Sequence, residues 1–427
     1  MKKYIVAVIC VALIFLIFIT FDLMKVKLNI SEVYSKDEEK TVIHFIDSEY
    51  FPQKIFDNFS IKYPNIKVEF EQYGINQYTN LQRTRILSSK NIDVMGIMNR
   101  DYSKFIDENY LDEITNEEFL KNYNKESILE LESISNSKKV FAVPYKSKVY
   151  GIWYNKILFD KYNLKFPKNY EEFIVVCKTL QSKGINPMVL GCRDNAVSSY
   201  VYYISTWGVL NRDPNFFRKL KTGAVKWTDK EMLDAFENTD EFIKNGYLSK
   251  KSISLTYEQA FSSFVNGQSA MCLMDDSSIN MYKPDTEKIC DLGVFPIPYN
   301  KVGNSIKVPG LKASSLIGIF SESKHKKEAR LLVSYLSDVK TAQLYCDETL
   351  SNCNINDIST SKLKHDDLWQ PLRNRALIPP ITSVLDLDVE EELNSGANEL
   401  IIGSKKVGEI LKEIQVTQDE VNSKRIK

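Results

Sequence analysis

The sequence predicts an α/β protein with largely parallel sheets, preceded by one apolar N-terminal segment. Strand-like and helix-like patterns alternate from residue 41 onward, and this alternation is typical of a parallel sheet covered by helices. A second series of the same kind begins near residue 150. The 427 residues are enough for about two or three domains.

The first series begins with a strand at 41–47 and a helix whose apolar residues recur at helical spacing until Pro64 stops it. The sequence IKVEFEQY at 66–73 alternates apolar and polar residues, as a half-buried strand does. A helix at 78–90 and a strand at 92–98 follow. The predicted order is therefore strand, helix, strand, helix, strand.

The second series continues the alternation through most of the remaining chain. Its expected strands are 150–155, 187–191, 270–274 and 315–320. Its expected helices, before a mostly helical C-terminus, are 156–163, 167–184, 199–210, 231–246, 256–267 and 323–338. The helix at 199–210 is apolar nearly all round, so we expect it to be buried together with its Trp207.

Composition argues against several classes of function. The 56 Lys and Arg residues balance the 56 Asp and Glu residues, whereas a nucleic-acid partner requires a basic face. Glycine is scarce at 16 residues, and neither glycine-rich phosphate-binding motif occurs. The three histidines are scattered and no Cys-x-x-Cys pair is present, so we expect no metal and no cofactor.

The seven cysteines are spread thinly along the chain. Cys346 and Cys353, in CDETLSNC, could close a short disulfide loop. Four others lie in apolar stretches, where a free cysteine behaves as a small hydrophobic residue: Cys177, Cys192, Cys272 and Cys290.

The N-terminal segment is a candidate membrane anchor. Residues 5–21 are apolar apart from Thr20, and at about 1.5 Å per residue they would span roughly 25 Å as a helix, enough for a thin bilayer. No small-x-small cleavage pattern follows, and Cys10 lies inside the run instead of after it. We therefore expect an uncleaved anchor helix at 1–24 and a tether at 25–40. A cleaved signal peptide and a lipoprotein are the alternatives.

Six segments occur in a set order between about residues 41 and 350. The first three are FDNFSIKYPNIKVEFEQY, NIDVMGI and KVFAVPYKSKVYGIWYNK with the proline-headed helix that follows it. YEQAFSSFVNGQSAMCLM, GVFPIP and KHKKEARLLVSYLSD complete the order. In this order and spacing they resemble the family 1 extracellular solute-binding proteins, the maltose-binding-protein-like receptors of ABC importers.

The resemblance implies a periplasmic-binding-protein-like clamp in which two α/β lobes close around a hinge. The expected N-lobe is 41–145 plus 298–340, and the expected C-lobe is 148–294 plus 345–420. The chain would cross between the lobes near 143–149, 295–300 and 339–347.

The resemblance also implies the function. The protein would capture a sugar or an oligosaccharide between its lobes, on the extracytoplasmic face of the cell membrane. It would deliver this ligand to the permease subunits of an ABC importer. We expect a monomer without a nucleic-acid partner. A membrane-tethered sensor that reports the ligand to a signalling receptor is the alternative.

Ligand-binding residues are expected in the loops at the carboxyl ends of the strands. Family members stack sugars on flat aromatic rings and bind the hydroxyl groups with carboxylates and amides. The candidates in this sequence are Asp47, Glu49, Tyr50, Tyr78, Asp101, Tyr102, Tyr145, Asp194, Asn195, Asp275 and Asp276.

Two positions depart from the family pattern. Many members carry a ring near the positions of Ala196 and Ser277, where this sequence has none. Either the ligand is not a typical oligosaccharide, or N-lobe tyrosines supply the rings, or the protein has another role. In the aromatic stretch 140–156, Tyr145 and, as a second candidate, Tyr150 are the rings expected near the cleft.

An enzyme is a further alternative, and the sequence disfavours it. Asp275 and Asp276 could act as a carboxylate pair in glycoside hydrolysis, but neighbouring side chains on a strand face opposite ways. No nucleophile with a base is visible among the scattered histidines. We therefore expect no catalysis.

Overall fold

The computed structural model describes residues 40–135, 137–193, 195–276, 278, 291–298, 307–349, 351, 353–358, 372 and 376–425. The expected anchor at 1–24, and the expected tether up to residue 39, lie outside these residues. Within the described ranges, no helix combines the length and the apolar character needed to cross a membrane.

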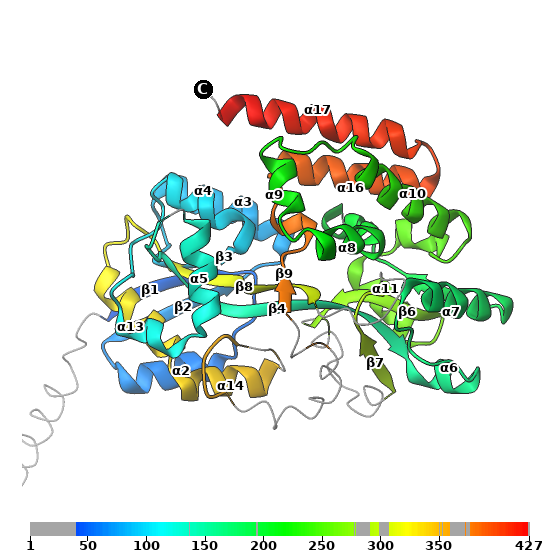
Figure 1. Cartoon of the computed structure of the whole chain (residues 1–427). Coiled ribbons are helices and arrows are strands. Elements are labelled where there is room, and N and C mark those ends of the chain that lie inside the picture. Colours follow the sequence, from blue (N-terminus) through cyan, green and yellow to red (C-terminus); the bar gives the residue numbers. More distant parts are fainter. Residues whose placement is uncertain are drawn as a thin grey trace, which may run out of the picture.

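One mixed sheet runs through the described part of the molecule (Figure 1). Its strands are β1 (Thr41–Asp47), β2 (Ile66–Gln72), β3 (Val94–Met98), β4 (Ala142–Asn155), β5 (Asn186–Val189), β6 (Ser269–Asp275), β7 (Leu292–Phe295), β8 (Lys307–Ile319) and β9 (Ala376–Ile378). Their order is β2-β1-β3-β8-β4-β6-β5, with β7 beside β4 and β9 beside β8. β1 is parallel to β2 and β3, whereas β8 is antiparallel to β3 and β4.

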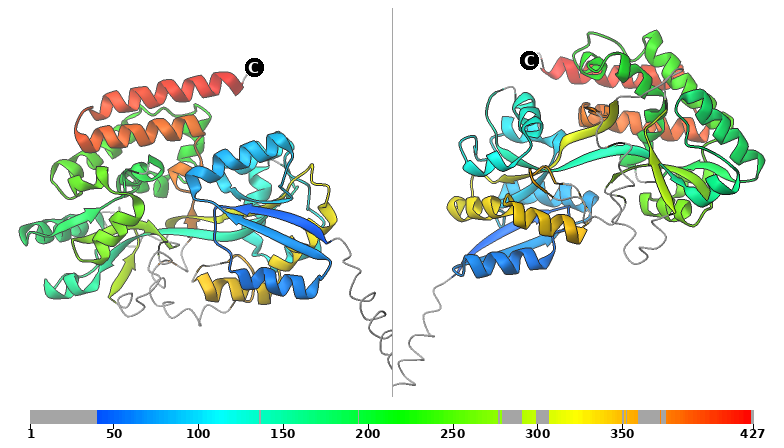
Figure 2. Two further views of the ribbon diagram at one scale, coloured as in Figure 1. Left: turned by 180° about the vertical axis from the view of Figure 1, so that it is seen from behind. Right: turned by 60° about the horizontal axis from the view of Figure 1, so that its bottom comes forward.

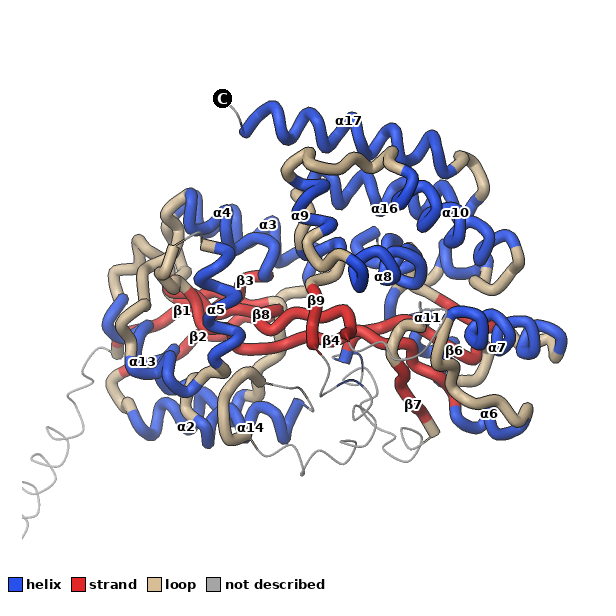
Figure 3. The backbone as a smooth tube through the Cα atoms, in the orientation of Figure 1, coloured by secondary structure: helices blue, strands red, loops and turns tan. Residues whose placement is uncertain are grey.

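The N-lobe surrounds the β1 end of this sheet, with helices on both of its faces (Figure 3). The helices are α2 (Gln53–Lys62), α3 (Ile75–Ser88), α4 (Tyr102–Asp107), α5 (Lys125–Ile134), α13 (Lys326–Leu336) and α14 (Val339–Thr349), with the short 3-10 helices η1 (Asn99–Asp101) and η2 (Glu118–Asn122). Four rings at the centre pack with centroids 5.0 to 6.3 Å apart: Phe45, Phe51, Phe56 and Phe70. The helical spacing of Ile55, Phe56 and Phe59 buries one face of α2 against this core.

The C-lobe surrounds the β6 end of the sheet. Its helices are α6 (Lys156–Lys161), α7 (Tyr170–Ser182), η3 (Asn195–Tyr202), α8 (Tyr203–Arg212), α9 (Phe216–Lys221), α10 (Lys230–Lys244), η4 (Lys250–Ser254), α11 (Tyr257–Val265), η7 (Ile381–Ser383), α16 (Leu387–Ile402) and α17 (Val407–Arg425). The expected buried helix at 199–210 is η3 followed by α8, and Trp207 in it is 1% exposed. α16 and α17 lie over η3 and α10 as an outer layer (Figure 2).

Two long strands, β4 and β8, join the lobes. β4 packs in the N-lobe core through Val143 and in the C-lobe core through Ile152. β8 runs the other way, so that Val308 packs beside the C-lobe strands and Ile317 packs in the N-lobe core. The pairing of the two strands shifts register on both sides of Lys146. Such an irregularity bends a two-stranded ribbon.

Two crossings differ from those expected. Ile297 still packs in the C-lobe core, and the second crossing lies within β8, between Val308 and Ala313. α14 packs in the N-lobe core through Tyr345, so the chain does not leave that lobe at 339–347. The physical reason is that the apolar face of α14 packs beside α2, and a sequence pattern does not reveal which neighbour such a face will find.

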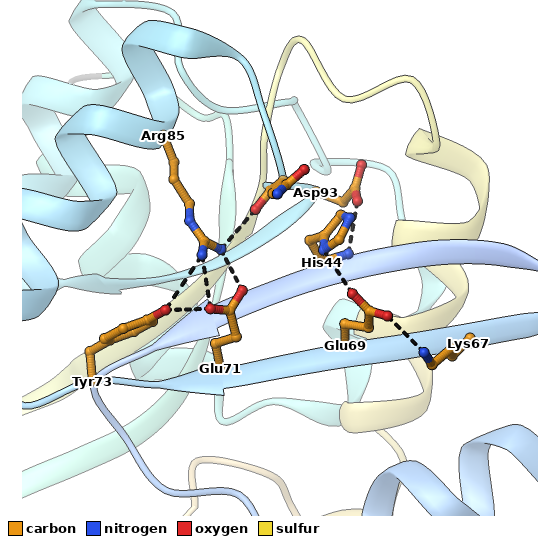
Figure 4. A network of polar contacts seen from close by, with 8 residues as sticks. His44, Lys67, Glu69, Glu71, Tyr73, Arg85 and Asp93 are labelled. Atoms are coloured by element: carbon orange, nitrogen blue, oxygen red, sulfur yellow. Dashed lines mark hydrogen bonds and ion pairs between the residues drawn. The ribbon is translucent and has the colours of Figure 1, made fainter.

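The outer edge of the N-lobe sheet carries a polar network (Figure 4). Arg85 of α3 donates two hydrogen bonds to Glu71 of β2, at 2.7 and 2.8 Å, and the Tyr73 hydroxyl donates to the same carboxylate. On the neighbouring strand, the backbone N–H of His44 donates to Asp93 at 2.9 Å. Charged side chains along an edge strand such as β2 disfavour pairing with another chain.

Replacing Tyr345 with alanine tests the position of α14. The ring is 1% exposed, and its centroid lies 5.1 Å from that of Phe51 and 5.0 Å from that of Tyr145. Its loss should therefore lower the free energy of unfolding by about 3–5 kcal/mol, measured by urea denaturation. Tyr50→Ala is the control because that ring is 44% exposed, and a change within about 0.5 kcal/mol is expected there. Equal small losses in both variants would contradict the packing of α14.

Candidate ligand-binding cleft

A cavity of about 780 Å³ lies between the two lobes. Its N-lobe side is formed by the carboxyl ends of β1 and β3 and the start of α3, and the β4–β8 ribbon forms its floor. Its C-lobe side comes from β4, η3, α11, η7 and α16. The charged and aromatic residues that line it are Asp47, Glu49, Tyr78, Arg100, Lys148, Tyr150, Arg193, Tyr200, Tyr257, Glu258 and Glu390.

Two carboxyl groups at the end of β1 differ in charge. Glu49 accepts a 2.9 Å hydrogen bond from Lys146 Nζ and another of 2.9 Å from Ser315 Oγ. Burial opposes its ionisation, but the charges of Lys146 and Lys148 lower the pKa of Glu49 to about 2. Burial and the negative charge of Glu49 raise the pKa of Asp47 to about 8. At neutral pH Glu49 therefore only accepts hydrogen bonds, whereas Asp47 is mostly protonated and can donate one.

Asp47 is held in place from both sides. A Cβ atom on Gly96 of β3 would lie 2.2 Å from Cγ of Asp47, so this close approach requires glycine. The Gly96 carbonyl accepts hydrogen bonds from the Tyr78 hydroxyl at 2.6 Å and from Gln82 Nε2 at 2.7 Å. The backbone N–H of Glu49 donates to Asp47 Oδ1 at 2.9 Å. The orientation of this carboxyl group is therefore set by the protein.

Tyrosine rings form the C-lobe wall of the cleft. Tyr150, Tyr200 and Tyr203 pack together with centroids 4.9 to 5.5 Å apart. The Tyr257 hydroxyl donates to Asp275 Oδ2 at 3.4 Å. Each ring has an apolar face and a polar tip, so the wall suits a ligand that is apolar on its flat faces and polar at its edges.

One ion pair bridges the cleft. Arg100 of the N-lobe donates from Nη1 to both carboxylate oxygens of Glu390 in α16, at 3.1 Å each. Burial raises the pKa of Glu390 to about 7, and Arg100 acts in the opposite direction. On the floor of the cleft, Lys148 Nζ lies 3.7 Å from Asp275 Oδ2. Both cations therefore face a carboxyl group.

The groups that line the cleft suit a polar ligand that also has apolar faces. Its hydroxyl, carboxyl and amide groups are donors and acceptors for a polar ligand, and its rings are stacking surfaces. Among the residues that the structure describes, no group of three or more His, Cys, Asp or Glu side chains could hold a metal ion.

Three of the eleven expected ligand-binding residues line the cavity: Asp47, Glu49 and Tyr78. Two more, Asp275 and Asp276, are buried beside the C-lobe wall. Asp275 contacts Lys148 and Tyr257 as described above, and Asp276 accepts a 3.2 Å hydrogen bond from the Val149 N–H.

Four expected residues lie elsewhere. Tyr50 is 44% exposed, and Asp101 is partly exposed at the end of η1. Tyr102 and Tyr145 are buried in the N-lobe core, where the Tyr102 hydroxyl accepts a 2.9 Å hydrogen bond from the Phe141 N–H. All four are described by the structure, and none of them lines the cavity.

Four positions singled out in the sequence fall outside the described residues. They are Asp194, Ser277 and the side chains of Asn195 and Ala196. The ligand-binding roles expected of Asp194 and Asn195 therefore stay predictions.

Sequence patterns alone do not identify most of the C-lobe wall. Tyr257 is the first residue of α11, after the capping residue Thr256, and it is not in a loop that follows a strand. Arg100 and Glu390 are 290 residues apart and meet only in the folded chain. Tyr200 has a sequence signal, because it is the first ring after the strand at 187–191.

Two α/β lobes joined by a bent ribbon, with a polar and aromatic cleft between them, define a two-lobed binding protein. The chain belongs to the bacterial extracellular solute-binding protein family, whose sequence profile matches residues 45–343. The match confirms the resemblance drawn from the sequence and an extracytoplasmic location.

The chain is similar to relatives in sequence and to solved structures in fold. The multiple sugar-binding protein of Streptococcus mutans is 25% identical over 321 residues, covering 73% of this chain and 74% of the relative. A structure from work on xylan utilization by the thermophilic bacterium Caldanaerobius polysaccharolyticus matches with a TM-score of 0.77 at 18% identity, covering 88% of this chain and 99% of that chain. A sugar transporter of Bacillus licheniformis in complex with stachyose gives a TM-score of 0.69 at 18% identity, covering 88% and 98%. These matches confirm the two-lobed α/β fold.

Replacing Asp47 with asparagine tests the raised pKa of this group. The ordinary pKa is 3.8, so between about pH 4 and pH 8 the folded protein holds a proton that the unfolded chain has released. The folded protein therefore loses stability relative to the unfolded chain as the pH rises through that window. Because asparagine does not titrate, the free energy of unfolding of D47N relative to wild type should rise with pH, by up to about 1.4 kcal/mol per pH unit. Urea denaturation at several pH values measures how this difference in free energy of unfolding changes with pH. A difference that does not change with pH would contradict the raised pKa of Asp47.

Proposed function

We propose that the protein captures a sugar or an oligosaccharide between its lobes and delivers it to the permease subunits of an ABC importer. The observation that carries the proposal is the cleft, in which tyrosine rings on one lobe stand opposite carboxyl groups on the other. Its volume of about 780 Å³ falls in the usual range for small-molecule sites. The names of a multiple sugar-binding relative and of a stachyose complex with the same fold support a carbohydrate ligand.

The two sides of the cleft suit the two kinds of surface on a sugar. The flat faces of a pyranose ring are apolar, and such a face can pack against the half-buried ring of Tyr257 and the edges of Tyr150 and Tyr200, which are 5% and 8% exposed. Sugar hydroxyl groups both donate and accept hydrogen bonds. Ionised Glu49 would accept from one hydroxyl, and protonated Asp47 would donate to another.

Under the proposal, Tyr200 and Tyr257 take the place of the aromatic rings that the sequence lacks at Ala196 and Ser277. Both tyrosines line the cavity from the C-lobe side. Under the proposal, η3 and α11 supply the stacking surface that other family members place in the two neighbouring loops. A carbohydrate ligand therefore does not require a ring at either position.

Lobe closure would couple ligand capture to transport. A ligand that touches both lobes stabilises the closed form by the difference between its affinities for the closed and open forms. The irregular register around Lys146 is a place where the β4–β8 ribbon can bend. The permease would then recognise the closed form.

The apolar segment at 5–21 would hold the protein at the membrane as a monomer. Its length would suffice for a thin bilayer, and no small-x-small cleavage pattern follows it. The polar residues at 25–40 would give the lobes room to reach the permease.

Tyr257→Ala should weaken sugar binding by about tenfold or more. An aromatic side chain at the centre of a binding site commonly contributes roughly 1–3 kcal/mol, and about 1.4 kcal/mol corresponds to a factor of ten. Tyr50→Ala is the matched control, because Tyr50 lies outside the cleft and should leave the affinity unchanged. Isothermal titration calorimetry of both variants measures the difference.

A thermal-shift screen of residues 36–427 against a panel of sugars supplies the ligand for that comparison. A ligand at about 100 times its dissociation constant adds about 2.7 kcal/mol of stability. If no sugar raises the melting temperature while peptides or other solutes do, the carbohydrate proposal is wrong.

N-terminal sequencing of the protein from the membrane fraction tests the anchor. We expect the mature chain to retain residues 5–21, and we expect deletion of residues 2–35, with a cleavable export signal supplied in their place, to release the protein from that fraction. A mature N-terminus near residue 25 would show that the segment is a cleaved signal peptide.

A further inference from the structure

Two cysteines of the N-lobe lie against each other. Cys346 is near the end of α14 and is 1% exposed, and Cys353 lies just beyond that helix and is partly buried. Their Sγ atoms are 3.1 Å apart. A disulfide bond is about 2.05 Å long, so a small adjustment of the two side chains would bring the sulfurs to bonding distance.

We propose that Cys346 and Cys353 form a disulfide bond in the extracytoplasmic protein. The proposal rests on the sulfur contact and on the extracytoplasmic location of the family, because disulfides persist in oxidising compartments. It does not depend on the identity of the ligand.

The bond would fasten to α14 a short segment that contacts β4 where the chain crosses between the lobes. Cys353 pairs with Lys146 of β4 in an antiparallel backbone bridge. The next residue, Asn354, donates from its backbone N–H to the Tyr145 carbonyl at 3.1 Å and from Nδ2 to the Pro144 carbonyl at 2.9 Å. Residues 353–355 therefore brace β4 beside its bend, and the disulfide would tie this brace to α14.

The oxidation is a thiol–disulfide exchange with an external disulfide, such as that of an extracytoplasmic thiol oxidoreductase. Cys353 is the more accessible thiol, so its thiolate attacks the external sulfur and releases one external thiol. The Cys346 thiolate then attacks Sγ of Cys353, forms the new bond and releases the second external thiol. The protons of the two cysteines end on the two released thiols, and the external disulfide is reduced. Because burial raises the pKa of Cys353, the exchange should be fastest before residues 353–355 dock.

The test is thiol mapping of the full chain, purified from the extracytoplasmic fraction without reductant and denatured in an alkylating reagent. We expect one proteolytic product in which Cys346 and Cys353 are joined, unalkylated and lighter by two hydrogen atoms. The buried C-lobe thiols of Cys177, Cys192 and Cys272 serve as the internal control and should be alkylated. Alkylation of both Cys346 and Cys353 would overturn the proposal.

Cys346→Ser separates this bond from any other pairing. In the variant, Cys353 should become fully alkylated, whereas protection of Cys353 would mean that it pairs with another cysteine and would also overturn the proposal. Dithiothreitol should lower the melting temperature of the wild type by about 3 °C and leave the C346S/C353S variant unchanged. An equal response of the two proteins would contradict the bracing role.

Discussion

The Lys146–Glu49 ion pair, at the bend of the ribbon that joins the two lobes, is the contact on which the cleft depends. β4 and β8 each contribute to both cores, so any change of the angle between the lobes acts on this ribbon. Lys146 is 3% exposed, and a buried ammonium group without a partner would be costly. The Glu49 carboxylate at 2.9 Å offsets that cost, and Ser315 of β8 fixes its second oxygen. The end of β1 is thereby fastened to the ribbon.

This ion pair also sets the electrostatics of the cleft. Burial, together with the negative charge of Glu49, keeps Asp47 protonated at neutral pH, so two acids only two residues apart have opposite hydrogen-bonding roles. The cations Lys148 and Arg100 each face a carboxyl group of their own. A site that is lined by charges of both signs, with donors and acceptors side by side, suits a neutral, hydroxyl-rich ligand better than an ion.

The C-terminal helices complete the cleft. The family profile ends at residue 343, yet η7 contributes Thr382 and α16 contributes Glu390 to the lining. The Thr382 hydroxyl lies 2.7 Å from that of Tyr203, which packs on the ring of Tyr200. The tail therefore holds the tyrosine wall through Tyr203 and supplies one end of the ion pair that bridges the lobes.

The sequence by itself determined the alternation of strands and helices, the family, and the acids Asp47 and Glu49 at the carboxyl end of a strand. The alternation follows from local periodicity, and the two acids follow from the rule that sites gather at strand ends. The family follows from the resemblance of six segments in a set order. Only the tertiary structure decided which tyrosines face the cleft. Tyr145 packs in a core although it was the ring expected at the hinge, whereas Tyr257 lines the cavity from a helix start.

The path of the chain after β8 and the meeting of Arg100 with Glu390 were likewise decided by the tertiary structure. An apolar pattern shows that a face will be buried, but it does not show which distant residues will cover it. The lining of the cleft is set by such long-range packing. The sequence therefore predicts the kind of site but not most of the residues that line it.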